Sequence, residues 1–202
     1  AGVPYRFFVP LVAFCVSSIA LIATLTPYRL ARLLAFADPW EHQFDSGYQL
    51  TQALIAFGRG EWVGLGLGNS IQKLFFLPEA HTDFLFSIVA EELGIIGAGL
   101  VILLFAALVL RGLAIGNAAR LQELQFHAYL AYGLSLVIGI QASINLGVNL
   151  GILPTKGLTL PFMSYGGNSL IVSCMMVALI LRIDYETRQF QTSNVKRAKR
   201  NG

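Results

Sequence analysis

Charged residues and cysteines are both scarce in this chain of 202 residues. Asp, Glu, Lys and Arg make up 12% of the sequence, whereas hydrophobic residues make up 55%. Soluble domains carry about twice that charged share, so the composition argues against an ordinary soluble fold. Cys15 and Cys174 are the two cysteines, and each lies in an apolar block. We therefore expect free, buried thiols rather than a disulfide.

Four long apolar blocks account for most of the hydrophobic residues. Residues 7–28 contain no charged side chain, and a helix of that length covers about 33 Å, enough to cross the hydrocarbon core of a bilayer. Similar blocks follow at about 84–110, 127–150 and 164–181. The sequence thus predicts an all-α polytopic membrane protein with four transmembrane helices.

Basic residues near the ends of these blocks indicate their orientation. Arg6 precedes the first block, Arg111 and Arg120 separate the second from the third, and further basic residues follow the fourth. Because Lys and Arg near span ends favour the cytoplasmic side, both ends of the chain are expected inside. The segments 28–82 and 151–163 are then expected outside.

Two features that could suggest nucleic-acid or nucleotide binding have simpler interpretations. The net charge of +3 comes from the cytoplasmic tail 183–202, where the basic run 196–200 is typical of a topology and anionic-lipid signal. The glycines from Gly64 to Gly68 resemble a phosphate-binding loop, but no strand precedes them and no Lys-Ser/Thr pair follows. We expect contact with membrane lipids and no nucleic-acid partner.

The outer loop 28–82 is too long and too apolar to be a simple connector. Residues 28–36 predict a short amphipathic helix, with two arginines on one face and leucines on the other, that lies along the membrane interface. Residues 48–57 predict a second short helix that ends at Gly58.

A polar stretch, residues 77–86, joins this loop to the second apolar block. It contains Glu79, His81 and Asp83 within five positions. A carboxylate held where a membrane helix emerges is placed to act on a lipid-borne substrate. His81 and Asp83 alternatively offer two ligands to a divalent cation, but two ligands do not make a metal site, so no metal site is predicted.

Glu91 and Glu92 lie inside the second block, where charge is costly. They should therefore face the protein interior or a polar cavity. In the simplest interpretation one acid is buried against an arginine or another polar partner and the other lies near the interface. Alternatively, both acids line a pathway for a lipid headgroup, as a flippase or transporter would require.

Two further segments carry polar groups into apolar surroundings. Gln141, Asn145 and Asn149 are four residues apart and share a helix face, which either joins helices or lines a polar cavity. The segment 153–168 contains two prolines and three glycines, so it cannot form a plain helix. Its Lys156 suits an anionic group, or alternatively serves as an interfacial anchor.

Seven motifs spread over nearly the whole chain resemble the SEDS family (shape, elongation, division, sporulation). They are Asp38-Pro-Trp, Ser46-Gly-Tyr-Gln-Leu-Thr-Gln52, Gly66-Leu-Gly-Asn69, Leu77-Pro-Glu-Ala-His-Thr-Asp83, Glu91-Glu-Leu-Gly94, Leu153-Pro-Thr-Lys-Gly157 and Ser164-Tyr-Gly-Gly167. The lysine-containing segment 154–161 resembles the corresponding segment in the cell-division branch of the family. Members have ten or so spans with both ends cytoplasmic, so the four predicted spans match the last four, and the chain resembles the C-terminal half of a member.

The resemblance implies a peptidoglycan glycosyltransferase of the bacterial cytoplasmic (inner) membrane, active at the division septum. Its substrate would be lipid II, an undecaprenyl-pyrophosphate-linked disaccharide peptide, polymerised at the outer face. The implied partners are the class B penicillin-binding transpeptidase FtsI and other divisome membrane proteins such as FtsQ, FtsL and FtsB. The alternatives are a lipid II flippase and a division scaffold without catalytic activity.

The implied site residues suit this chemistry. The resemblance assigns the catalytic role to Asp83, since an attacking sugar hydroxyl needs a general base, and substrate contact to Lys156, since a departing pyrophosphate is stabilised by positive charge. Unlike a glycosidase, the reaction needs no second acid. No cofactor is certain, and a divalent cation is kept as an alternative. Further candidates for substrate binding are Arg59, Lys73, Glu79, His81, Glu91, Asn145 and Ser164.

Overall fold

A computed structural model describes residues 4–25, 36–77 and 81–201. Those residues form helices and connecting loops, with no strand among them. The helices are α1 (Tyr5–Leu25), α3 (Tyr48–Gly60), the short π-helix η1 (Gln72–Phe76), α4 (Leu85–Leu121), α5 (Gln125–Asn149) and α6 (Gly167–Asn201).

The structure confirms an all-α polytopic membrane architecture. Three of the described helices, α4, α5 and α6, are long and apolar enough to cross a bilayer. They correspond to the second, third and fourth predicted spans, and α1 corresponds to the first as far as Leu25. The end of that span and the predicted helix at 28–36, except its last residue, lie outside the described residues.

Several helices extend further than the apolar blocks do. α4 continues from the predicted end at 110 to Leu121, and α6 continues from 181 to Asn201. Neither extension contains proline, so the backbone hydrogen bonds continue after the apolar stretch has ended. The second short outer helix was predicted to stop at Gly58, but α3 continues to Gly60.

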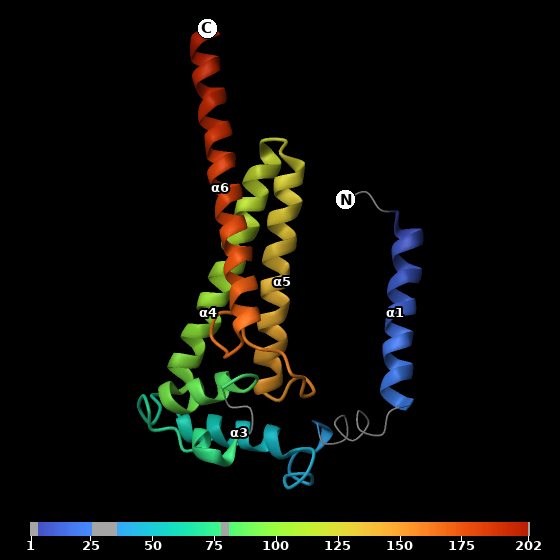
Figure 1. Cartoon of the computed structure of the whole chain (residues 1–202), viewed down its shortest axis with the longest axis vertical. Coiled ribbons are helices and arrows are strands. Elements are labelled where there is room, and N and C mark those ends of the chain that lie inside the picture. Colours follow the sequence, from blue (N-terminus) through green and yellow to red (C-terminus); the bar gives the residue numbers. More distant parts are fainter. Residues whose placement is uncertain (1–3, 26–35, 78–80, 202) are drawn as a thin grey trace.

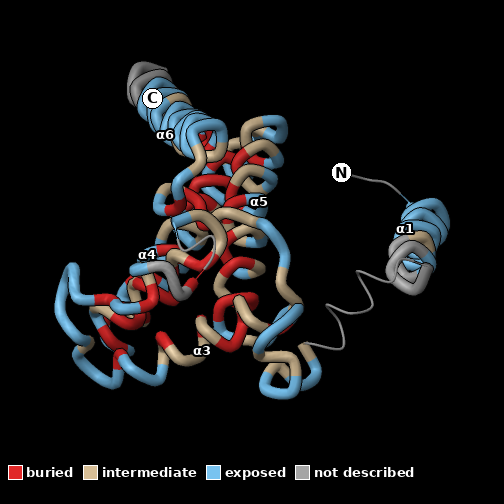
Figure 2. Tube along the Cα trace, turned by 60° about the horizontal axis from the view of Figure 1, so that its bottom comes forward, coloured by how far each residue is buried: buried red, intermediate tan, exposed pale blue. Residues whose placement is uncertain are grey.

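Figure 1 shows α4, α5 and α6 side by side, with α3 lying across one end of the three-helix bundle. The same end carries the loop between α5 and α6, and the opposite end carries the turn between α4 and α5. This grouping matches the predicted orientation, in which the outer loop and the segment 151–163 share one side. α1 stands apart from the bundle in Figures 1 and 2.

Small residues line the contacts between the three long helices, where Figure 2 shows the buried part of the chain. Ala119, Ala128 and Ala131 are at most 1% exposed within a core cluster that also holds Ile115 and Ile138. Small side chains let helix backbones approach closely, which favours association of membrane helices.

The two cysteines are free, as expected, but they are not buried. Both Cys15 and Cys174 are exposed, so the prediction of buried thiols is wrong. Each cysteine lies on a helix face that does not pack against another helix. An apolar residue on such a face is exposed even though its neighbours in sequence are apolar.

α4 is interrupted at Gly94, whose backbone adopts φ 66° and ψ −168°. In a continuous helix the N–H groups of Ile95 and Ile96 would donate to the carbonyls four residues earlier. Here Ile95 N–H donates to Glu61 O (2.9 Å) and Ile96 N–H to Trp62 O (3.3 Å).

The interruption also leaves two carbonyls of α4 without their usual helical donors. N–H groups of the loop that follows α3 donate to them. Leu65 N–H donates to Glu91 O and Gly66 N–H to Glu92 O, each at 3.0 Å. The loop that follows α3 therefore exchanges four hydrogen bonds with the break in α4. No polar backbone group at these four positions of α4 is left without a partner, which would be costly at membrane depth.

Glycine is required where this loop meets α4. A Cβ atom at Gly60 would overlap the carbonyl oxygen of Ala90, and one at Gly64 would overlap that of Glu92. Gly64 also has φ +83°, which favours glycine. Gly68 has a similar φ of +86°, but a Cβ atom there would meet nothing within 4 Å.

This pair of glycines gives a matched test of the loop–helix contact. Gly68→Ala should cost only the backbone penalty, about 1–2 kcal/mol. Gly64→Ala adds a clash with α4 and should cost about 1–3 kcal/mol more. Thermal unfolding of the two variants in detergent measures the difference, and equal melting temperatures would show that the loop does not pack tightly on α4.

Candidate functional site

Asp83 lies at the point where the outer loop enters α4, two residues before the helix begins. Its carboxylate faces the loop between α5 and α6: a Cβ atom at Gly157 would lie 3.1 Å from Asp83 Oδ2. Gly157 directly follows Lys156, so the structure brings the loop segments of Asp83 and Lys156 together. A larger residue at 157 would crowd the carboxylate.

Two amides of α5 hold the backbone at Asp83. Asn145 Nδ2 and Asn149 Nδ2 each donate to Asp83 O at 2.9 Å. Asn149 Oδ1 in turn accepts from the N–H (3.1 Å) and hydroxyl (2.7 Å) of Ser87, in the first turn of α4. Because Asn145 and Asn149 are at most 2% exposed, this joint between α4 and α5 is shielded from water.

The same polar face of α5 holds the loop that carries Lys156. Asn145 Nδ2 also donates to Leu158 O, and Gln141 Nε2 donates to Thr159 O at 3.0 Å. The polar face therefore joins segments of the chain, which is the first of the two alternatives that its spacing predicted. Lys156 itself is exposed.

Two more hydrogen bonds hold the loop between α5 and α6 near the start of α4. Leu160 N–H donates to Ser164 Oγ at 2.8 Å, and Tyr165 N–H donates to His81 O at 2.8 Å. Ser164 is buried and His81 is exposed. The candidate site thus consists of Asp83, His81 and Lys156 on two loops that the buried amides of α5 hold in place.

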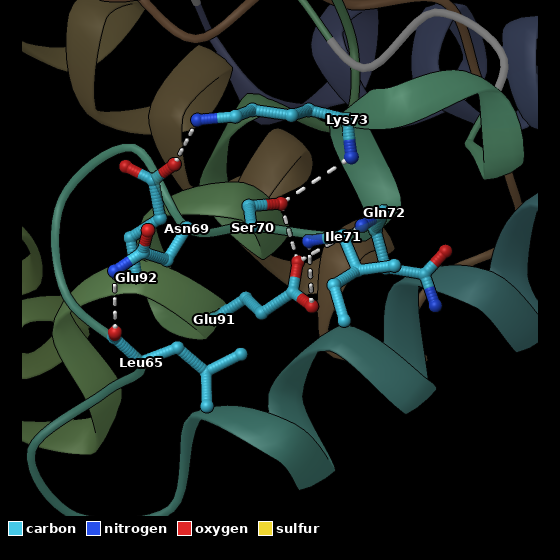
Figure 3. A network of polar contacts seen from close by, with 8 residues as sticks. All are labelled: Leu65, Asn69, Ser70, Ile71, Gln72, Lys73, Glu91 and Glu92. Carbon is cyan, nitrogen blue, oxygen red and sulfur yellow. Dashed lines mark hydrogen bonds and ion pairs between the residues drawn. The ribbon is translucent and has the colours of Figure 1, made fainter.

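Glu91 belongs to a second polar network, drawn in Figure 3. Its side chain is fully buried and accepts hydrogen bonds from the Ser70 hydroxyl and from the N–H groups of Ile71 and Gln72 (both 3.3 Å). Arg59 Nη1 lies 3.8 Å from Glu91 Oε1. This carboxylate ties the start of η1 to α4.

Glu92 is paired separately, with Lys73 Nζ 2.6 Å from Glu92 Oε1 (Figure 3). The simplest interpretation of the two acids is confirmed for Glu91, which is buried against an arginine and other polar partners. Arg59 and Lys73, predicted as substrate contacts, are thus engaged with acids of α4, in a network other than the one around Asp83.

Glu79 lies outside the described residues. Among the residues that the structure describes, no group of three or more His, Cys, Asp and Glu side chains could hold a metal ion. Sequence patterns assigned no role to Ser87 or to Gly157, because their importance depends on partners 62 and 74 positions away in the chain.

The family model described as "Cell cycle protein", which covers FtsW, RodA and SpoVE, matches residues 1–189. The chain belongs to this family. Its membership agrees with the motif positions, since the two loops joined by α5 carry the motifs that include Asp83 and Lys156. The matched range contains α1, α4 and α5 completely and α6 as far as residue 189.

Curated members of the FtsW/RodA/SpoVE family are closely similar to this chain in sequence. Proteins from Hahella chejuensis (62% identity, 92% of this chain, 47% of the relative) and Halomonas elongata (59%, 100% and 51%) both carry the name probable peptidoglycan glycosyltransferase FtsW. The chain spans about half the length of the curated relatives that it matches.

A solved structure has the same fold. It is described as "Structural coordination of polymerization and crosslinking by a peptidoglycan synthase complex", and one of its chains superposes with a TM-score of 0.66 at 31% identity. The match covers 93% of this chain and 51% of that chain.

The joint at Asn149 can be tested by substitution. Asn149→Leu removes the acceptor of the Ser87 hydroxyl and one of the two amide donors to Asp83 O, and each such loss costs about 1–3 kcal/mol. The melting temperature of the protein in detergent should fall clearly. Ser143→Leu, at an exposed position of α5, should leave the melting temperature nearly unchanged; an equal fall in both would contradict a specific role for Asn149.

Proposed function

We propose that the protein of which this chain forms part is a peptidoglycan glycosyltransferase that polymerises lipid II during cell division. The observation that carries the proposal is the placement of the Asp83 carboxylate against the loop of Lys156, at the end of the helical bundle that also carries α3. The names of relatives at 56–62% identity support the same activity.

Asp83 is proposed as the general base. The reaction joins a sugar hydroxyl to an anomeric carbon: the C–O bond to the acceptor forms, the bond to the pyrophosphate breaks, and the hydroxyl proton passes to the base. A positioned carboxylate typically speeds such a proton transfer by about 10²–10⁴-fold. The buried amides fix the Asp83 backbone, so the carboxylate needs little reorientation when substrate binds.

Lys156 is proposed to stabilise the departing pyrophosphate. Its exposed position on the loop beside Gly157 leaves the ammonium able to reach an anionic group of the substrate. Pyrophosphate leaves readily, so positive charge matters more than a second acid. A divalent cation would add charge at the same place, and His81 and Asp83 with the phosphate oxygens are the ligands that it would use.

We place the protein in the bacterial inner membrane at the division septum, with a class B transpeptidase such as FtsI and the proteins FtsQ, FtsL and FtsB as proposed partners. The multi-pass helices support a membrane location, and the solved synthase complex supports a transpeptidase partner. The flippase alternative loses its main argument, because Glu91 and Glu92 are engaged with Arg59 and Lys73.

Asp83→Asn keeps the size of the side chain but removes the base. We expect the full-length protein, purified with its transpeptidase partner, to lose at least about 100-fold of its lipid II polymerisation rate. Gel analysis of glycan products measures the rate. Protein level and partner binding should stay near normal, because the side chain is partly exposed.

Glu79→Gln is the comparison variant, and its loss of rate should be much milder, because a pyrophosphate leaving group needs no second acid. An Asp83→Asn protein that still makes glycan strands would overturn the assignment. A protein that moves the lipid II headgroup across vesicles without making polymer would favour the flippase, and one that does neither would favour the scaffold.

Lys156→Ala should raise the barrier of polymerisation by about 2–4 kcal/mol, as expected for losing a charged contact to the developing charge. Lys156→Arg should retain part of the activity because it keeps the charge. Rates at saturating and at low lipid II separate a loss of turnover from a loss of binding. A normal rate for Lys156→Ala would mean that the lysine is only an interfacial anchor.

A further inference from the structure

The loop that follows α3 presents a run of exposed apolar side chains. Trp62, Val63 and Leu67 are each at least 70% exposed, and Leu65 is exposed as well. No charged residue occurs in the segment 62–72. A contiguous apolar patch of this kind marks a surface that meets another protein or a membrane. Residues 62–67 are called the apolar loop below.

The backbone polar groups of the apolar loop have partners although its side chains do not. Gly64 N–H donates to Gly60 O (2.8 Å), and Asn69 donates from its N–H to Gly66 O (3.2 Å) and from Nδ2 to Leu65 O (3.1 Å). Four further hydrogen bonds join the loop to the break in α4, as described above. Irregular backbone is tolerated at membrane depth only where such partners exist, so the loop can meet lipid without leaving these groups unpaired.

The length of α4 sets the depth of this loop. Residues 95–110 contain no charged side chain, and Arg111 follows them. A helix of that length covers about 24 Å, whereas the hydrocarbon core of a bilayer is about 30 Å thick. With Arg111 at the far boundary of the core, the break at Gly94 lies about 6 Å inside the near boundary. The backbone of Trp62 packs directly on Gly94, so the apolar loop lies at the depth where tryptophan is enriched in membrane proteins.

The apolar loop also continues the outward surface of α4. Ile95 and Ile96, whose N–H groups donate to the start of the loop, are more than half exposed, as are Leu100 and Leu103 further along the helix. One apolar surface therefore runs from the loop along the second part of α4. A bilayer that surrounds this part of the helix also meets the loop.

We propose that the apolar loop is a membrane anchor, with the Trp62 ring at the headgroup boundary and the side chains of residues 63, 65 and 67 among the acyl chains of the outer leaflet. Charged residues border it only at its two ends, Glu61 and Lys73, where the chain returns to the headgroups. This anchor fixes the depth of the segment that leads through η1 to Asp83. The depth and the continuity with α4 favour lipid over a water-soluble partner, which would have to reach below the headgroups.

The test measures the depth of position 67 in the full-length protein, in vesicles of phosphatidylcholine and phosphatidylglycerol. A single cysteine, Leu67→Cys, carries a nitroxide label, with the other cysteines replaced by serine. Leu103→Cys is the reference within the membrane, because Leu103 is exposed on α4. Ser46→Cys is the reference in water, because Ser46 is exposed in a segment that contains Asp38, Glu41 and Asp45.

Oxygen dissolves in the hydrocarbon core, whereas a charged or hydrated nickel chelate stays in water. The ratio of oxygen to nickel accessibility at position 67 should therefore lie between the ratios at 46 and 103 and clearly above that at 46. In protein that keeps its own cysteines, a benzophenone amino acid at position 67, but not at 46, should crosslink to phospholipid.

Equal ratios at positions 67 and 46 would overturn the proposal, because the apolar loop would then lie in water. A label at 67 that neither oxygen nor nickel reaches would also overturn it, since another part of the protein or a partner would then cover the loop. Crosslinks from 67 to protein alone would have the same meaning. If the cysteine variants fail to fold, the crosslinking result decides.

Discussion

Two buried side-chain amides, those of Asn145 and Asn149, connect the parts of the chain from which the candidate site is built. They satisfy the carbonyl of Asp83 at the start of α4 and that of Leu158 in the loop before α6. Both carbonyls are part-buried, and the amides that bind them belong to side chains that are at most 2% exposed, so these hydrogen bonds are largely shielded from water. Together with the hydrogen bond from Tyr165 N–H to His81 O, they set the separation between the segments that carry Asp83 and Lys156.

The loop between α3 and Asp83 has a second attachment, at the other end of the first part of α4. Glu91 accepts three hydrogen bonds from residues 70–72, and the break at Gly94 takes up the loop that follows α3. The segment that leads to Asp83 is therefore held at its beginning by a carboxylate and at its end by amides. Arg59 of α3 and Lys73 of η1 pair with the two acids of α4 at this attachment, which explains why both lie apart from Asp83.

The sequence was most informative where a pattern repeats locally. Spacing of four along α5 identified the polar face, and apolar length identified the three long helices within the described residues. It was least informative where partners are distant in the chain. The amide face of α5 connects segments only because it binds Asp83, 62 residues away. The break in α4 depends on a loop about 30 residues earlier. Nothing local distinguishes Gly94 from the other small residues of that helix.

The hydrophobic pattern also says little about which apolar residues face the core. In a membrane bundle both faces of a helix are apolar, so the environment of Cys15 and Cys174 could not be derived from their neighbours in sequence. The hydrophobic pattern also misplaced helix ends. Apolar blocks end at the membrane surface, whereas α4 and α6 continue as long as backbone hydrogen bonds can form.

The break in α4 changes the electrostatics of the helix as well as its hydrogen bonds. An uninterrupted helix carries a partial positive charge at its beginning and a partial negative charge at its end, far apart. Gly94 divides α4 into 85–93 and 95–121, so the negative end of the first part meets the positive end of the second at one point. These opposite partial charges largely cancel there, and the loop after α3 binds the backbone groups that carry them. The partial positive charge at the start of α4 remains beside Asp83.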